Sequence, residues 1–350
     1  MSKKWMAAAI AVTGLGALTA CNSSNNNVSM SGAGSTFINP VMTRWTTDFS
    51  QAHPNVRINY QSIGSGAGIQ QVKAKTVDFG ASDAALSDAQ LAAMQPLIQI
   101  PESAGPVCIT YNLPGLNAPL RLSSAAMAGI FLGTIKTWTD PILAKDNPGV
   151  KLPKVGVVVS HRSESSGTTS IFTTYLDAVS PDWHNKVGKG TAVSWPTGIG
   201  GKGSEGVTGN IRNTPGAIGY VELIYAQQNH LPTASIENAA GQYVQPTAAG
   251  TTSAIAAYGA QLAQDPRTPI VNPPASAADA YPISGLTFLI IPKDGPDKAT
   301  RTALKQFAQY IITDGQATAG TLNYAPLPDS VKQYDQQQLD TLTAAGQPIS

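Results

Sequence analysis

The sequence predicts an α/β fold with two lobes. Three turns rich in glycine or serine, in residues 31–37, 62–68 and 162–168, each lead into a segment with apolar residues at helical spacing. Alternating or β-branched apolar runs, typical of strands, precede the second and third turns. The roughly 330 residues after the first 20 are enough for two lobes with separate hydrophobic cores.

The central unit spans residues 155–176. A β-branched run stops there at a polar turn, and apolar residues at helical spacing follow. Ser166 or Thr168 can cap the helix, whose first N–H groups have no partner within the helix, so the turn offers donors and a partial positive charge to an anion. An ordinary capped helix after a strand is the alternative. Arg162 in the same turn favours an anion site.

The first residues have the pattern of a targeting segment. Two lysines and an apolar stretch, 5–18, are followed by small residues and Cys21. This pattern is similar to the lipobox of bacterial lipoproteins. It predicts a signal peptide over residues 1–20, a lipid on Cys21 and a flexible tether over 21–27. A plain secretory signal with an incidental cysteine is the alternative. No later segment reaches the roughly 20 apolar residues of a membrane-spanning helix.

Composition excludes several classes of function. The formal net charge is +1 and 12% of residues are charged, so there is no basic field for nucleic acid. Cys108 lies alone in an apolar run, which predicts a buried, reduced thiol and excludes a disulfide framework. The four histidines lack the spacing of zinc ligands, so no metal site is predicted.

The first two turns lie in the N-terminal part of the chain. In the first, Ser35 or Thr36 is expected to cap a helix with Pro40 near its first turn. The second follows a strand over 56–60 and leads into a helix over 69–73. A dinucleotide-binding fingerprint is the alternative there. It is disfavoured because no acidic residue ends a second strand about 20 positions later.

Asp83 ends a short strand predicted over 77–83. An ionised carboxylate in a ring of N–H donors can only accept hydrogen bonds, so it requires a ligand that brings its own proton. Hydrogen phosphate does so and sulfate does not, so such a residue would select against sulfate. The alternative is a residue at the start of a helix over 84–94, capped by Ser82 or Ser87.

Other segments carry weaker signals. The stretch Gly200–Ser204 differs from a P-loop because no Ser or Thr directly follows Lys202, so we expect a loop at the edge of a cleft. Ser166 lacks the flanking glycines of a hydrolase nucleophile elbow. The remaining apolar patterns predict strands over 107–112, 215–221 and 286–292, and a helix over 306–313 that Gly315 stops.

Several ordered blocks together resemble a known family. The blocks are SGAGSTF, YQSIGSGAG, TVDFGASDAALS, FLGTIKTW, HRSESSGTTSIFTTYL, the loop 195–203, PGAIGYVE and NYAPLPDSV. Over residues 31–331 they look like the substrate-binding proteins of bacterial phosphate ABC transporters. The resemblance implies a two-lobed periplasmic-binding-protein fold of type II. It also implies one dehydrated phosphate in the cleft between the lobes, held by hydrogen bonds without metal or cofactor.

The resemblance also assigns phosphate contacts, all at the three turns and at the end of one strand. It implies hydroxyl and main-chain donors at Thr36 and Phe37, a serine donor at Ser65, the acceptor at Asp83, the guanidinium at Arg162, and hydroxyl and N–H donors at Ser166, Gly167 and Thr168. Relatives commonly carry an Asp two residues after the arginine to hold the guanidinium, where this chain has Glu164. The longer carboxylate can still reach Arg162. A surface turn residue is the alternative.

The chain must pass between the two lobes twice if its C-terminal segment returns to the N-terminal lobe. The strand ending near residue 112 and the segment 281–283 are the candidates. Lobe one is therefore expected over 28–112 plus 283–350, and lobe two over 113–282.

The resemblance implies a monomeric lipoprotein at the periplasm or the outer face of a bacterial membrane. It would bind inorganic phosphate, deliver it to the permease and ATPase of an ABC importer, and have no catalytic residue. One alternative is a binding protein for another oxyanion or an adhesin that keeps the fold. The other is a phosphate-ester hydrolase with Ser166 or Asp83 as nucleophile, which lacks a placed general-base histidine or metal cluster.

Overall fold

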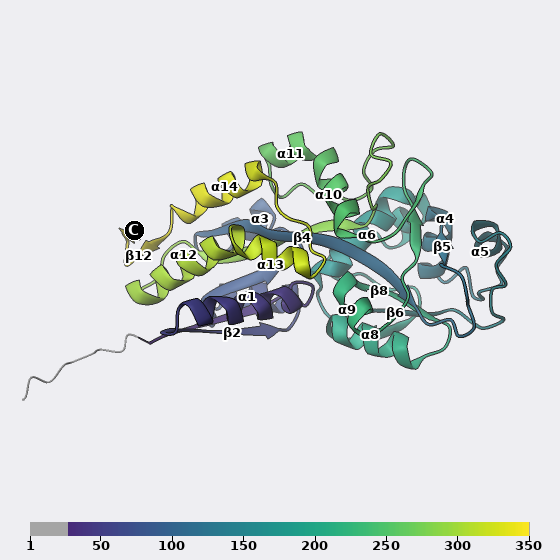
Figure 1. Ribbon diagram of the computed structural model, residues 1–350, viewed down its shortest axis with the longest axis horizontal. Coiled ribbons are helices and arrows are strands. Elements are labelled where there is room, and N and C mark those ends of the chain that lie inside the picture. Colours follow the sequence, from purple (N-terminus) through teal and green to yellow (C-terminus); the bar gives the residue numbers. More distant parts are fainter. Residues whose placement is uncertain (1–26, 350) are drawn as a thin grey trace, which may run out of the picture.

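A mixed eight-stranded sheet runs through the protein in the order β2-β1-β3-β11-β4-β8-β6-β7 (Figure 1). The computed structural model describes residues 27–349, so the predicted signal peptide, Cys21 and the tether up to residue 26 lie outside the described residues. The strands of this sheet are β1 Val28–Gly34, β2 Val56–Ser62, β3 Phe79–Ser82, β4 Leu97–Tyr111, β6 Val158–Arg162, β7 Ile199–Gly201, β8 Ala217–Glu222 and β11 Ser284–Pro292.

Helices and two small sheets cover this sheet. The small sheets contain β5 Arg121–Leu122, β9 Ser235–Glu237 and β10 Tyr243–Val244, and β12 Thr343–Ala344 with β13 Gln347–Pro348. The helices are α1 Asn39–Ala52, α2 Ser65–Lys73, α3 Asp88–Ala92, α4 Ser124–Phe131, α5 Pro141–Asp146, α6 Gly167–Val179, α7 Pro181–Lys186, α8 Gly203–Asn213, α9 Leu223–Gln228, α10 Ala248–Ala257, α11 Gly259–Gln264, α12 Lys298–Ile312, α13 Gly315–Thr321 and α14 Asp329–Leu339. Within the described residues, no helix has the length and apolar character needed to cross a membrane.

Strand β4 connects the two halves of the molecule (Figure 1). It pairs antiparallel with β11 over residues 97–106 and with β8 over residues 107–111. The strand expected over 107–112 therefore begins ten residues earlier, at Leu97. Cys108 on this strand is buried and free, as expected, and its burial raises the pKa of the thiol well above its usual value.

One core cluster crosses the lobe boundary expected near residue 282. Ile255 and Leu262, from α10 and α11, pack in one cluster with Leu286 and Phe288 of β11. Helix α11 lies beside α14 at the top of the view in Figure 1, and α10 packs on β4 and β11. The division into lobes at residues 112 and 282 stays a prediction.

The start of α1 differs from the expectation. Ile38 occupies the N-cap position and makes no side-chain capping bond, whereas Ser35 or Thr36 was expected there. The reason is that both hydroxyls have other partners: Ser35 bonds Asp83 and Thr36 bonds Ser204. Pro40 lies in the first turn as expected.

Other helix boundaries also differ. Helix α2 begins at Ser65 instead of residue 69, and Gly68 inside it allows its backbone to approach Gly34 of β1. Helix α3 covers only Asp88–Ala92, where Ser87 and Gln90 form a capping box. Helix α12 starts at residue 298 instead of 306, and Gly315 opens α13 instead of ending a helix.

Candidate functional site

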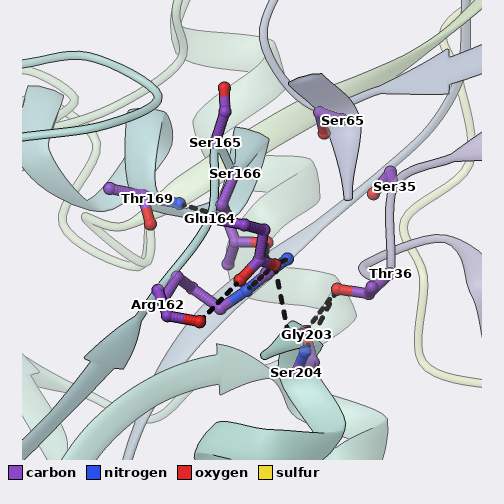
Figure 2. Close-up of polar contacts among 12 residues, drawn as sticks. Ser35, Thr36, Ser65, Arg162, Glu164, Ser165, Ser166, Thr169, Gly203 and Ser204 are labelled. Atoms are coloured by element: carbon purple, nitrogen blue, oxygen red, sulfur yellow. Dashed lines mark hydrogen bonds and ion pairs between the residues drawn. The ribbon is translucent and has the colours of Figure 1, made fainter. Parts of the chain in front are cut away.

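Three helix starts and the turn before α1 meet at one place (Figure 2). The backbone N–H of Gly167 in α6 donates to Ser65 Oγ of α2 at 3.1 Å. At the start of α8, the N–H of Ser204 donates to Thr36 Oγ1 at 3.2 Å. Because helix N-termini carry unpaired N–H groups and partial positive charge, this meeting point favours an anion.

Arg162 ends β6 and points into this site. Its side chain is only 1% exposed. Nε donates to Glu164 Oε1 at 2.8 Å, Nη2 donates to the same oxygen, and Nη1 donates to Thr168 Oγ1 at 3.3 Å. Its backbone N–H donates to the Tyr220 hydroxyl at 3.1 Å, which fixes the end of the strand. The guanidinium is therefore held rigidly in a buried position.

Glu164 contacts Arg162, as predicted for this longer carboxylate, so the alternative of a surface turn residue is not what the structure shows. Glu164 Oε1, which accepts from the guanidinium, also accepts from the N–H of Gly203 at 3.1 Å (Figure 2). Gly203 is the first residue of α8. The Glu164 side chain is 22% exposed. Glu164 therefore connects the guanidinium to the start of a second helix, a contact that the sequence did not indicate.

Asp83 follows β3 and is buried, with 5% of its surface exposed. Its partners differ from the expected ring of N–H donors. The Ser35 hydroxyl donates to Oδ1, and the Thr168 hydroxyl donates to Oδ2 at 3.2 Å. Burial raises the pKa of Asp83, whereas the hydrogen bond from Ser35 and the charge of Arg162 oppose the rise.

The start of α6 supplies the other predicted donors. Ser166 is the N-cap and its hydroxyl oxygen accepts from the N–H of Thr169 at 3.1 Å, so Ser166 and not Thr168 caps this helix. Ser65 Oγ accepts from both Gly167 and the N–H of Asp83, the latter at 3.3 Å. The predicted residues of α2, β3 and α6 are thus brought together.

Phe37 lies beside these residues with its ring fully buried. Its N–H donates to Ser35 Oγ at 3.0 Å, and its carbonyl accepts from the Tyr324 hydroxyl at 2.6 Å. In this arrangement the main chain of Phe37 is bonded within the protein. It shapes the turn that positions Ser35 and Thr36.

The stretch 200–204 was expected to be a loop, and this expectation is wrong. Gly200 and Gly201 lie in β7, and Gly203 begins α8. This is a fourth strand–turn–helix unit, and Ser204 Oγ lies 3.0 Å from Thr36 Oγ1. The apolar residues Val207 and Ile211, four positions apart and buried, carried a helical signal that could have revealed it.

Tyr225 in α9 is a second residue that the sequence did not indicate. Its hydroxyl donates to the carbonyl of Thr36 at 2.6 Å and lies 3.0 Å from Glu205 Oε1. The contact joins residues 189 positions apart, so no local pattern could predict it.

A family model described as a PBP superfamily domain matches residues 21–315. The phosphate-binding protein PstS of Xylella fastidiosa (strain Temecula1) is 43% identical over 311 residues, which cover 88% of this chain and 84% of that protein. The PstS of Pasteurella multocida is 41% identical over 313 residues, 89% of this chain and 90% of that protein. The chain belongs to the PstS family of phosphate-binding proteins.

Solved structures share the fold of this chain. A phosphate-bound periplasmic phosphate-binding protein, PfluDING, superposes with a TM-score of 0.70 at 25% identity, covering 89% of this chain and 93% of that one. The ancestral soluble variant of the human phosphate-binding protein gives a TM-score of 0.72 at 22% identity, with the same coverage. The predicted two-lobed periplasmic-binding-protein fold is confirmed.

The site combines one buried cation with two carboxyl groups. Arg162 contributes one positive charge, and the carboxyl of Glu164 lies on one side of its guanidinium. Thr168 links the other side to Asp83. The cation and the N–H and hydroxyl donors suit an oxyanion. Because carboxylates can only accept hydrogen bonds, the site favours an oxyanion that is itself protonated and can donate to one of them. Within the described residues, no group of three or more His, Cys, Asp or Glu side chains could hold a metal ion.

Proposed function

We propose that the protein binds inorganic phosphate at this site and delivers it to the permease and ATPase of an ABC importer. The observation that carries the proposal is the buried guanidinium of Arg162 among three helix starts, with the carboxyl of Asp83 on the other side of Thr168. Relatives that share most of the chain are named phosphate-binding proteins, which supports the same ligand here.

We assign the ligand contacts as follows. Thr36, Ser65, Ser166, Gly167 and Thr168 donate hydroxyl or N–H hydrogen bonds, and the N–H of Phe37 would exchange its bond to Ser35 Oγ for one to phosphate. Arg162 donates through its guanidinium, and Asp83 accepts a hydrogen bond from the O–H of hydrogen phosphate. Each charge-assisted bond contributes roughly 1.5–3 kcal/mol. The planar fork of Arg162 can meet two phosphate oxygens at once.

We further propose that phosphate binding is coupled to closing of the two lobes. Lobe one, 28–112 plus 283–350, holds Ser65, and lobe two, 113–282, holds Gly167. The bond between Ser65 Oγ and the N–H of Gly167 joins these two segments. An anion that accepts from donors of both segments would stabilise the closed form, which a permease could then recognise.

The proposal extends to location and assembly. We place the protein in the periplasm or on the outer face of a bacterial membrane, anchored by a lipid on Cys21 after removal of residues 1–20. It acts as a monomer and has no enzymatic activity. The names of the relatives describe binding proteins, which supports a binding role rather than a catalytic one.

Calorimetry with phosphate and sulfate tests the proposed function. Phosphate should bind with one site per chain, and sulfate at least about a hundredfold more weakly at neutral pH, because sulfate leaves Asp83 facing an unpaired like charge. Asp83→Asn should reduce this ratio at least tenfold or so, since the amide can donate to sulfate. Asp48→Asn, on the outer face of α1, is the control and should keep the wild-type ratio.

Three outcomes would contradict the proposal. Equal affinity for phosphate and sulfate in the wild type would point to a general oxyanion-binding protein. An unchanged ratio in Asp83→Asn would remove the assigned role of that carboxylate. Turnover of a phosphate ester that is lost on replacing Ser166 or Asp83 would indicate a hydrolase.

A further inference from the structure

Strand β4 carries a β-bulge directly behind the site. Thr287 of β11 pairs with Ser103, whereas the next residue, Phe288, pairs with Pro101. Glu102 is therefore the extra residue on β4. Bulges are enriched beside functional sites, where they redirect a side chain. The bulge is also anchored, because Gln316 of α13 donates from Nε2 to the Glu102 carbonyl at 2.9 Å.

The bulge directs a glutamate into the interior. Glu102 is fully buried. Its Oε1 accepts from the Thr287 hydroxyl at 3.0 Å, and its Oε2 has no hydrogen-bond partner among the described residues. An ionised carboxylate with one unpaired oxygen is costly in such a place. Burial raises the pKa of Glu102 to about 8, against the opposing hydrogen bond from Thr287, so burial favours the protonated carboxyl near neutral pH.

Thr287 lies between Glu102 and Asp83. Ser82 pairs with Phe288 in the antiparallel ladder, so the next residue, Asp83, lies beside Thr287. Burial raises the pKa of Asp83, and hydrogen bonding by the Ser35 and Thr287 hydroxyls is among the effects that lower it. A hydroxyl has a single hydrogen, so Thr287 can donate to only one of the two carboxyls at a time.

The groups that face Glu102 come from several strands. Asp83 after β3 raises its pKa by charge, and Tyr60 of β2 is near enough for the charge of Glu102 to raise the tyrosine pKa, after the larger effect of burial. Thr287 of β11 and Gln316 of α13 contribute hydrogen bonds. None of these groups is a cation, so the compensation available to an ionised Glu102 is limited to the charge of Arg162, which acts on Asp83 from the other side.

We infer that Glu102 is a positioning residue of the anion site, acting on Asp83 through Thr287. This inference rests on the proposed phosphate binding. When Glu102 is protonated, the 3.0 Å contact with Thr287 can run in the opposite direction, with the Glu102 carboxyl donating to Thr287 Oγ1. The Thr287 hydrogen is then left for Asp83, and Glu102 adds no negative charge behind it. When Glu102 loses its proton to solvent, Thr287 donates to Glu102 instead. A second negative charge then lies behind Asp83 and weakens binding of the anion.

The test is the pH profile of phosphate affinity, measured by calorimetry on the full chain. Wild-type affinity should fall at least about fivefold between about pH 7.5 and pH 9.5, where the dianion is the main form of free phosphate. Glu102→Gln cannot ionise and should show less than about a twofold fall over this range. Thr287→Val, which keeps Glu102, should bind at least about threefold more weakly at pH 7.5, because Asp83 loses a donor. It should still show the fall at high pH.

A second buried carboxyl provides the matched control. Asp335 in α14 is fully buried, and burial alone raises its pKa to about 9. Asp335→Asn should therefore keep the wild-type affinity profile. A wild-type profile that is flat above pH 7.5, or a Glu102→Gln profile that superposes on the wild type, would overturn the inference. If Glu102→Gln does not fold, wild-type affinity for Thr287→Val at pH 7.5 would overturn it. Failure of the wild type to bind phosphate at any pH would instead overturn the proposed function.

Discussion

At the scale of one residue, Glu164 fixes the position of the buried Arg162 guanidinium relative to the start of helix α8. Its Oε1 accepts from Arg162 and from the N–H of Gly203. Removing this carboxylate would free the guanidinium to adopt other rotamers and would leave the first N–H of α8 without its acceptor. Both effects lower the preorganisation of the site before the ligand arrives.

We therefore predict that Glu164→Ala weakens phosphate binding by roughly ten- to a hundredfold, the equivalent of one charge-assisted hydrogen bond. Glu164→Gln should lose less, because its amide oxygen can still accept from one of the two donors. Calorimetry at neutral pH measures both, and Glu237→Ala in β9 is the control. Affinity of Glu164→Ala within about twofold of wild type would show that the site orients Arg162 without this carboxylate.

Single residues were predictable where chemistry and position coincide. Thr36, Ser65, Asp83, Arg162 and Ser166 all lie where an apolar run meets a polar turn, so the sequence could single them out as candidate site residues. Their roles in phosphate binding follow from the family resemblance and stay a prediction. Their exact partners could not. Asp83 bonds the hydroxyls of Ser35 and Thr168 instead of N–H groups. Those hydroxyls come from segments far from Asp83 in the chain, so no local pattern could indicate them.

At the scale of elements, helix α2 shows how two glycines in one helix serve different contacts. A Cβ on Gly68 would come within 2.5 Å of the carbonyl oxygen of Ala33, a neighbour in β1. A Cβ on Gly66 would instead overlap the side chain of Ser165, which precedes α6. The N–H of Gly66 also donates to the Ser165 carbonyl at 3.1 Å. Gly68 thus serves packing of α2 on its own strand, and Gly66 serves contact with the other half of the site.

Gly66→Ala should therefore affect phosphate binding, whereas Gly68→Ala should affect stability. Gly66→Ala should weaken phosphate binding at least about tenfold by separating α2 from α6, with a thermal midpoint equal to or above wild type because alanine favours the helix. Gly68→Ala should lower the midpoint by several degrees, about 1–3 kcal/mol of overpacking. Calorimetry and thermal unfolding of the two variants give the comparison. Equal loss of stability in both variants would contradict this prediction, because it would show that the contact of Gly66 with Ser165 contributes to folding as much as the packing of Gly68 on β1.

Elements were predictable where their pattern was regular. The apolar strands β8 and β11 were expected, and both are buried. The first half of β4 was not expected, because Pro101 and Glu102 contradict the rules for a central strand. The bulge at Glu102 accommodates them, so the residues that hid the strand are the ones that redirect its side chains.

For the whole molecule, the sheet order depends on contacts that no local pattern contains. Strand β11, near residue 290, inserts between β3 and β4, which lie near residues 80 and 100. The interior assembled in this way contains carboxyl groups that are protonated at neutral pH. Burial raises the pKa of Glu102 to about 8 and of Asp335 to about 9, and raises that of Glu222 well above its usual value.

These carboxyls make global stability depend on pH. Asp335 is the clearest case, because neither carboxylate oxygen has a partner among the described residues. Its pKa in the folded protein is about 9, above the ordinary 3.8. Between these values the folded protein keeps a proton that the unfolded chain releases. The free energy of unfolding therefore falls as pH rises through this range, by up to about 1.4 kcal/mol per pH unit for one such group.

Asp335→Asn removes this proton from the balance, so the stability advantage of the variant over the wild type should grow with pH. Urea unfolding at about pH 5, 6.5 and 8 should show the difference in free energy of unfolding increasing by roughly 1 kcal/mol per pH unit. The other buried carboxyls are present in both proteins, so their contributions cancel in this difference. The exposed Asp279→Asn is the control and should show a constant difference near zero. A constant difference for Asp335→Asn would mean that its carboxyl ionises equally in the folded and unfolded protein, which would require a rearrangement that brings water or a donor to α14.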